Sequence, residues 1–480
     1  MAPFFEQKRK LWESAGLDLT STIPLTLTDP LPKNVLQYLR IQRLDESDLN
    51  TIALQQIDPK YEKISDSNEV QVLLSLIESF SGLLDSFGTQ LEELEERLAQ
   101  GAYPSGGNAW AAAYVSLGEQ RVLRSARKRA EDMLAAVESG SGKEKDMTAI
   151  RKVLISEFGG VDKVTVVEDI CPTPPPGHVQ IATEYSGFTG GDVSMRKGIY
   201  PEQKPAPLTP GYCLVGTIRL IGEGCTAVAM KQGDTVAVLT KYDAQAELVN
   251  QPEKYCIKVP EGLDHQQVTA LLCDWSTAYA MIKHTAKITK GQRVFIHGLS
   301  GAVGCGLMIL CQLYGAEVYG TAGLRNHDLI RSYGAIPYDY NEKRWVKEMK
   351  ALGAHAVFDP LGFESFDESY DILTPDGILV AYGNNMDSLG NREPRDPTPA
   401  VIKLLARNNP QSTKRTEFFG LTRDAPTYVD DIKALMDMIQ RGVIAVPIKK
   451  VWAMDDIQTA HTEWGGGNGI GSVLIKVAGV

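Results

Sequence analysis

A glycine-rich turn between a strand pattern and an apolar helix pattern is the clearest chemical feature of this 480-residue sequence. The strand Arg293–His297 leads into Gly298-Leu-Ser-Gly-Ala-Val-Gly304, and the apolar run Leu307–Tyr314 follows. Glycines let the backbone approach a pyrophosphate, and the free N–H groups of a helix's first turn favour its negative charge. The order strand, turn, helix predicts a dinucleotide site, with a tight packing turn without ligand as the alternative. The predicted pyrophosphate residues are Ser300, Gly301, Ala302, Val303 and Gly304.

The end of the next strand predicts which dinucleotide binds. A cofactor with a free ribose 2′-hydroxyl usually meets an Asp or Glu about 20 residues after the glycines, and this sequence has none there. Thr321 and Gly323 leave room for a 2′-phosphate, and Arg325 offers it a charge-assisted fork. We therefore predict NADPH rather than NADH. The alternative is that Arg325 is a solvated surface charge.

The whole chain has the composition of folded protein. It is 43% hydrophobic and 23% charged, and its length predicts two or three domains. Its formal charge of 49 − 60 = −11 argues against nucleic acid or an anionic membrane surface as a partner. Seven scattered cysteines without a CxxC pair, no apolar leader and no run of about 20 apolar residues predict a cytoplasmic protein.

The chain changes character near residue 145. Amphipathic helical patterns come first, including Val70–Phe87 and Val122–Val137. A small, charged linker follows, and then a β-rich stretch begins at Met147. From about 270 to 420 strands and helices alternate, which predicts a doubly wound parallel sheet. The predicted fold class is α/β with a β domain and a Rossmann domain, preceded by an all-α domain.

Residues 147–480 resemble the zinc-free medium-chain dehydrogenases/reductases, in the branch of quinone oxidoreductases (zeta-crystallin-like) and synaptic-vesicle amine-transport protein homologues. The resemblance covers about seven tenths of the chain and rests on eight segments in the family's order. These are Lys197–Pro201, Thr209–Gly211, Gly233–Val236, Thr277–Tyr279, Arg293–Gly304, Phe358–Gly362, Leu373–Gly377 and Ala381–Asn384.

The resemblance implies the domain boundaries and further site residues. It implies a helical domain at 1–138, a linker at 139–146, a GroES-like catalytic domain at 147–268, a Rossmann NADP-binding domain at 269–421, and a return to the catalytic domain at 422–480. Carried over by position, the added cofactor residues are Thr277, His327, Tyr340, Gly383 and Asn384. His327 stands where relatives often carry a phosphate-binding lysine, which weakens the preference for NADPH.

Zinc-dependent members of the resembled family carry a Cys, a Gly-His-Glu and a second Cys, and this chain departs from that pattern. The corresponding stretches read Ser186–Gly190 and Gly211-Tyr-Cys213, so we predict no metal. Hydride delivery to a quinone or an α,β-unsaturated carbonyl remains, because its developing charge can rest on an oxygen. The residues predicted for catalysis are Tyr200, as a donor to that oxygen, with Thr189 and Asp192.

The first 140 residues resemble, more weakly, the substrate-binding domain of Rubisco large-subunit lysine methyltransferases. The match rests on spaced leucines in Pro24–Arg40 and on Glu119–Arg124. It implies a domain that binds a protein partner or simply packs. Alternatives to a free-standing quinone or enone reductase are a non-catalytic nucleotide-binding scaffold, a trans-acting enoyl reductase in polyketide biosynthesis, and a merger of two genes at Met147. We expect a homodimer, as is usual in the resembled family.

Overall fold

The computed structural model describes residues 66–87, 91–100, 102, 108–138, 148–200, 203–225, 230–390, 393 and 395–477. The chain divides into two compact units, Met1–Lys145 and Asp146–Val480. The predicted linker 139–146, the candidate start Met147 and the stretch Pro24–Arg40 lie outside the described residues. Each unit is considered by itself.

Three helices of the first unit are described: α4 (Asp66–Asp85), α5 (Leu91–Ala99) and α6 (Asn108–Glu138). Apolar residues of α4, among them Leu73 and Phe80, pack on Ala126 and Ala130 of α6. The predicted helical domain is confirmed over these ranges, and α6 begins well before the predicted Val122. None of the described helices combines the length and apolar composition needed to cross a membrane.

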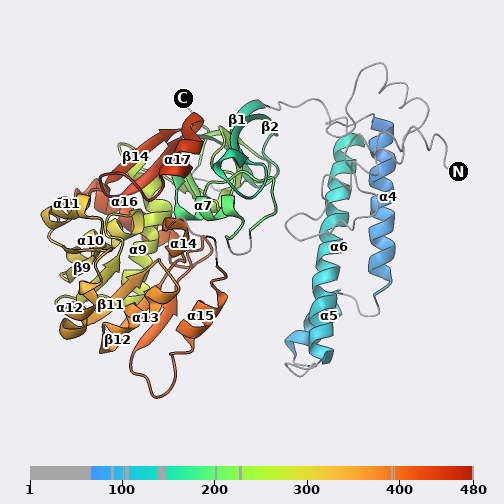
Figure 1. The fold of residues 1–480 in the computed structure, drawn as a ribbon. Helices are drawn as coiled ribbons and strands as arrows, with labels where there is room; N and C mark the ends of the chain where they lie inside the picture. The colour runs from blue at the N-terminus through green and yellow to red at the C-terminus, as the bar shows by residue number, and fades with distance from the viewer. Residues whose placement is uncertain are drawn as a thin grey trace. The chain divides into compact units, whose positions relative to one another are not determined.

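The second unit contains a mainly antiparallel seven-stranded sheet. Its strands are β3 (His178–Phe188), β4 (Cys213–Ile221), β5 (Thr235–Leu239), β6 (Leu248–Pro252), β7 (Ile257–Lys258), β14 (Ile448–Ala453) and β15 (Ser472–Lys476). The hairpin of β1 (Thr148–Ile155) and β2 (Val164–Cys171) adjoins it through isolated bridges, and α7 (Gly190–Lys197) and α17 (Ile457–Glu463) are its α-helices. β15 pairs with β3, so the end of the chain returns to the sheet begun about 290 residues earlier (Figure 1).

The other sheet of this unit is six-stranded and wholly parallel. Its order is β10-β9-β8-β11-β12-β13, which is the doubly wound dinucleotide-binding order. The strands are β8 (Arg293–His297), β9 (Glu317–Ala322), β10 (Ile336–Asp339), β11 (Ala354–Asp359), β12 (Leu373–Ala381) and β13 (Arg415–Phe418). The chain order reverses between β8 and β11, so a ligand crevice is expected at their carboxyl ends.

Helices cover both faces of the parallel sheet (Figure 1). They are α9 (Ser276–Ala280), α10 (Ala302–Leu313), α11 (His327–Ser332), α12 (Arg344–Leu352), α13 (Glu364–Asp371), α14 (Met386–Leu389), α15 (Thr398–Leu405) and α16 (Tyr428–Gln440), with π-helical turns η3 (Leu271–Trp275) and η4 (Met281–Ala286) around α9. The short helix α8 (His265–Ala270) precedes η3 and packs on β3, β4 and β15 of the other sheet. Alternate residues of each strand face opposite cores, as a pleated strand requires. In β8, Val294 and Ile296 join the core with α9, α10 and α16, and Phe295 joins the core with α12 and α13.

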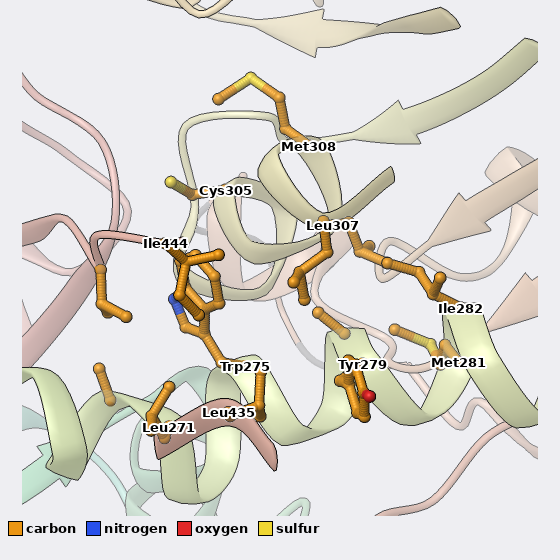
Figure 2. Close-up of a cluster of buried hydrophobic side chains, with 14 of the residues drawn as sticks. Leu271, Trp275, Tyr279, Met281, Ile282, Cys305, Leu307, Met308, Leu435 and Ile444 are labelled. Atoms are coloured by element: carbon orange, nitrogen blue, oxygen red, sulfur yellow. The ribbon is translucent and has the colours of Figure 1, made fainter. Parts of the chain in front are cut away.

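The larger core lies between the parallel sheet and the helix that carries η3. Figure 2 shows Trp275 reaching from that helix toward Cys305 of α10 and Ile444. A Cβ added at Gly306 would lie 3.4 Å from the Trp275 ring, so this glycine lets α10 and the Trp275 helix approach closely. The core therefore fixes the position of α10, whose first turn begins at the glycine-rich loop.

The predicted fold class is confirmed, and the predicted strand Arg293–His297 coincides with β8. The boundaries of the two domains within the second unit stay predictions.

Trp345 of α12 tests the packing of the core that Phe295 forms with α12 and α13. It is 2% exposed and stacks on Phe295 with ring centroids 4.8 Å apart. We expect Trp345→Ala to lower the free energy of unfolding by about 3–5 kcal/mol, because it leaves a large cavity. Urea denaturation followed by circular dichroism measures the change. The control Leu352→Ala, at an exposed position of the same helix, should change it by less than about 0.5 kcal/mol. Equal effects would contradict this packing.

Candidate functional site

The glycine-rich turn has the geometry of an anion site. Gly301 is the N-cap of α10 and makes no side-chain cap, so the first N–H groups of this helix have no side-chain acceptor at the cap. Gly298 has φ +76°, and a Cβ added at Gly304 would lie 2.0 Å from the Gly298 carbonyl oxygen. Only glycine fits at Gly304 without a backbone shift. The structure brings Ser300, Ala302 and Val303 to this turn as well.

A buried polar network holds this turn against the neighbouring strands. Thr321 Oγ1 accepts a hydrogen bond from Gly298 N at 3.2 Å and lies 3.4 Å from His297 Nδ1. His297 Nε2 lies 3.0 Å from Ser369 Oγ, which donates to Asp359. Burial, partly opposed by the charge of Asp359, lowers the pKa of His297, so its ring is neutral near pH 7. Thr321 thus positions the turn rather than only leaving room for a phosphate.

Three of the residues predicted at the 2′-phosphate lie together near the ends of β9 and β10. A Cβ added at Gly323 would lie 3.4 Å from Tyr340 Cε1 and 4.0 Å from Arg325 Cζ. Arg325 and Tyr340 are exposed. His327 differs, since it is 6% exposed and its Nε2 lies 3.1 Å from the Ala322 carbonyl oxygen. His327 therefore faces inward and supports the strand end, so we withdraw it as a phosphate contact.

The loop after β12 carries an acceptor without a partner. Asn384 Oδ1 is buried and has no hydrogen bond in the described structure, and it lies 2.8 Å from where a Cβ of Gly362 would stand. Gly383 is equally close-packed, with the Pro360 carbonyl oxygen 2.8 Å from its virtual Cβ. An orphaned acceptor at the carboxyl end of a central strand suits an amide donor of a ligand. Thr277, on α9, is 8% exposed.

Thr189 and Asp192 have structural tasks at the start of α7. Thr189 N and Oγ1 donate to Asp192 Oδ2 at 2.8 and 3.1 Å, and Gly191 N donates to Thr189 Oγ1, which completes a capping box. Asp192 Oδ1 also accepts from Gly211 N at 3.1 Å and Gln245 Nε2 at 3.3 Å. These contacts occupy both side chains. We therefore replace their predicted catalytic role with a positioning role.

Two tyrosines lie beside this capped turn. The Tyr200 and Tyr212 rings meet edge to face with centroids 5.6 Å apart, and Tyr212 packs against Gly191. The Tyr212 hydroxyl is buried with no partner in the described residues. Burial, and then the charge of Cys273 on η3, raises the pKa of Tyr200 well above its usual range. The Tyr200 phenol keeps its proton near neutral pH and can donate it.

Two residues that the sequence reasoning did not place in the site now join it. Tyr212 was noted only as a departure from a zinc ligand pattern, although its hydroxyl is a free donor. Lys449, on β14, lies close enough to Arg325 for that charge to lower its pKa, after the larger effect of burial. Five glycines between Gly465 and Gly471 mark the loop beside Lys449 and were the available sequence signal.

Within the described ranges, no three His, Cys, Asp or Glu side chains converge as metal ligands. Cys213 is 1% exposed, and burial raises the pKa of its thiol. Its sulfur lies 2.7 Å from the place where a Cβ of Gly187 would stand, in a close-packed part of the sheet. Cys213 is a packed core residue there.

Comparisons with known proteins agree with this architecture. Residues 175–270 match the alcohol dehydrogenase GroES-like domain, residues 334–475 the zinc-binding dehydrogenase family model, and residues 1–123 the Rubisco LSMT substrate-binding family model. The synaptic vesicle membrane protein VAT-1 homolog of Rattus norvegicus is 27% identical over 342 residues, which are 68% of this chain and 84% of that protein. A probable quinone oxidoreductase of Schizosaccharomyces pombe is 28% identical, covering 64% of this chain and 92% of its own.

Solved structures share the fold. A human VAT-1 homolog-like protein superposes with a TM-score of 0.59 at 23% identity, covering 70% of this chain and all of that one. An Escherichia coli quinone oxidoreductase complexed with NADPH gives 0.59 at 20% identity, covering 68% of this chain and 99% of that chain. A mycobacterial protein complexed with NADPH gives 0.59 at 25% identity, covering 68% and 99%.

Asp274 is a buried acid at the boundary between the two sheets of this unit. It lies on η3, is 5% exposed, and accepts a hydrogen bond from Ser472 Oγ of β15 at 2.6 Å. Burial raises its pKa to about 7, although the Ser472 hydrogen bond opposes the shift. The folded protein therefore holds a proton that the unfolded chain, with a pKa of about 4, has released.

The raised pKa of Asp274 predicts how the stability of the protein changes with pH. Since the native state binds more protons than the unfolded state between about pH 4 and 7, the Asp274 contribution to stability falls as pH rises through this range. We expect the unfolding free energy of wild type, relative to Asp274→Asn, to decrease across it. Urea denaturation at a series of pH values measures the difference. The control Asp376→Asn, at an exposed position, should show no such trend, and a flat difference for Asp274→Asn would refute the assignment.

Proposed function

Because residues 146–480 have the medium-chain dehydrogenase/reductase fold and are related to VAT-1 homologues and quinone oxidoreductases, we propose that this chain is an NADPH-dependent oxidoreductase. Its proposed substrates are quinones or α,β-unsaturated carbonyl compounds, reduced without zinc. The single observation that carries the proposal is the glycine turn at the switch point of a doubly wound sheet, where Gly304 admits no Cβ.

The residues at the strand ends fit the proposed cofactor. The first turn of α10 would hold the pyrophosphate, and Arg325 with Tyr340 would face the ribose 2′-phosphate. The orphaned Asn384 Oδ1 would accept a hydrogen bond from the nicotinamide carboxamide. NADPH, when bound, supplies a hydride. Thr277 and Gly383 would complete the nicotinamide side of the site.

The two tyrosines supply what a metal-free reduction needs. Hydride addition to the β-carbon of an enone moves an electron pair onto the carbonyl oxygen, and a quinone oxygen gains charge in the same way. The phenol hydroxyls of Tyr200 and Tyr212 can donate hydrogen bonds to that oxygen, and the Tyr200 phenol can transfer a proton, which solvent then replaces. By the resemblance, Tyr212 stands at the position of a histidine zinc ligand. A tyrosine donor would therefore take over the polarising task of the metal.

The first experiment measures binding and turnover together. We expect the purified full-length chain to bind NADPH, seen as quenching of its tryptophan fluorescence, and to oxidise it when 1,4-benzoquinone or methyl vinyl ketone is added. Loss of absorbance at the nicotinamide band, with a protein-free reaction as control, follows turnover. Binding without turnover of any quinone or enone would leave a nucleotide-binding scaffold and refute the proposed activity.

Substituting phenylalanine distinguishes a hydrogen-bonding role of the two tyrosine hydroxyls from a packing role of their rings. We expect Tyr212→Phe and Tyr200→Phe each to lower kcat by about 100-fold, because each removes only a hydroxyl that donates to the charged oxygen. The dissociation constant of NADPH should stay within about twofold. Tyr242→Phe is the matched control, because the Tyr242 hydroxyl already accepts a hydrogen bond from Lys204 N at 3.0 Å. Unchanged kcat in both test variants would remove the tyrosines from the mechanism.

A further inference from the structure

A second glycine cluster, Gly465–Gly471 in the order Gly-Gly-Gly-Asn-Gly-Ile-Gly, lies between α17 and β15. Gly465, Gly467, Gly469 and Gly471 all have positive φ, between +76° and +106°. At Gly471 an added Cβ would lie 2.0 Å from the Pro447 carbonyl oxygen. Glycine is therefore required at Gly471, and the loop follows a path that other residues rarely adopt.

This loop is hydrogen-bonded to the pyrophosphate turn and to the segment after β9 where the 2′-phosphate is predicted to bind. Gly471 N donates to the carbonyl oxygen of Ser300 in the pyrophosphate turn at 3.2 Å. Gly469 N donates to Asn326 Oδ1 at 3.0 Å, and Asn326 follows Arg325 directly. The two hydrogen bonds join the loop between α17 and β15 to the segments that follow β8 and β9. The loop thus lies where the pyrophosphate and the 2′-phosphate would both be reached.

The side chain of Lys449 packs along the same loop. Its Cγ lies 3.7 Å from where a Cβ of Gly469 would stand, its Cε 3.8 Å from that of Gly467, and its Nζ donates to the Gly466 carbonyl oxygen. The side chain is partly buried, and it borders a cavity of about 220 Å³ that Trp464 and Glu463 also line. The ammonium group is held in place by one carbonyl.

Arg325 and Lys449 are cations that flank the hydrogen bond between Gly469 and Asn326, because the Lys449 side chain lies against Gly469 and Arg325 directly precedes Asn326. Burial, followed by the positive charge of Arg325, lowers the pKa of Lys449. Neither has a carboxylate partner among the described residues. Two neighbouring cations repel each other, and burying part of one adds a desolvation cost. An anion bound between the two cations would offset both their repulsion and the cost of desolvating Lys449. A phosphate monoester suits this position, because it carries close to two negative charges at neutral pH.

We propose that Lys449 and Arg325 together bind the ribose 2′-phosphate of NADPH, with the Gly465–Gly471 loop holding Lys449 in place. This inference rests on the proposed function. It supplies the second cation that His327, facing inward, does not provide. The charge comes from the opposite sheet of the unit, so the 2′-phosphate site is complete only when β14 and the end of β9 are assembled.

The test compares two nucleotides that differ only in the 2′-phosphate. NADPH and NADH are titrated into full-length wild type, Lys449→Met, Arg325→Gln and Lys450→Met, and their dissociation constants are measured by isothermal titration calorimetry. We expect Lys449→Met and Arg325→Gln each to weaken NADPH by about tenfold and leave NADH within about twofold. Lys450→Met is the matched control on the same strand, since Lys450 lies over the Trp452 ring and is exposed. Lys449→Arg should retain the preference.

The outcomes separate this inference from the proposed function. Wild type that binds NADPH more tightly than NADH, with the preference lost in Lys449→Met and kept in Lys450→Met, supports it. An unchanged ratio in Lys449→Met overturns it and leaves the oxidoreductase proposal intact. Equal binding of both nucleotides by wild type also overturns it alone. Failure of wild type to bind either nucleotide overturns the proposed function and, with it, this inference.

Discussion

The buried carboxylate of Asp359 fixes the loops at the switch point of the parallel sheet. It is fully buried, and it accepts hydrogen bonds from Leu361 N and Gly362 N of its own loop and from Ser365 and Ser369 of α13. A buried carboxylate is tolerated only with such complete hydrogen bonding. Through Ser369 and the neutral ring of His297, the same network reaches Thr321 and the glycine turn. Three strand ends therefore share one polar framework, and the position of each depends on the others.

Local patterns were sufficient to predict the elements around this framework. Strand β8, the turn at Gly301 and helix α10 are adjacent in the sequence, so periodicity and glycine spacing were informative. The side-chain tasks of Thr189, Asp192 and His327 were not predictable in the same way, because a hydroxyl, a carboxylate or an imidazole can serve a cap, a strand end or a ligand equally well. Hydrogen bonds seen only in the fold decided between these. Lys449 could not be found from local pattern, since it lies 124 positions after Arg325 in the sequence.

Backbone strain concentrates beside the candidate site. Phe363, directly after the Asp359 loop, has φ +54° and ψ −125°, and Lys241 beside Tyr200 has φ +81°. Such conformations cost about 1–3 kcal/mol each and persist only where the surroundings hold them. At Phe363, the guanidinium of Arg395 lies 4.0 Å from the ring centroid and also pairs with Asp387 and Glu364. At Lys241, Tyr212 O accepts the backbone N–H. The contacts that maintain these strained conformations therefore also lie beside Tyr200, Tyr212 and the loop after β12.

Unpaired polar groups help to distinguish a binding site from an ordinary core. Among the described residues, the Trp275 indole N–H and both His461 ring nitrogens have no hydrogen-bond partner, yet Trp275 packs in an apolar core and His461 meets Phe188 edge to face at 4.9 Å. These unmade hydrogen bonds are a cost of packing, and burial lowers the pKa of His461 to about 3, so its ring stays neutral.

Asn384 Oδ1 and the Tyr212 hydroxyl differ, because each adjoins a glycine turn or loop at the boundary between the two sheets. There an unmade hydrogen bond, worth about 1–3 kcal/mol, becomes available to a ligand instead of being lost. The cations Arg325 and Lys449 are similar in kind, because a bound anion would offset their charges as a ligand would satisfy an unpaired hydrogen-bonding group. Of these residues, Asn384 and Arg325 follow β12 and β9, at the carboxyl ends of the parallel sheet where a doubly wound fold binds a dinucleotide.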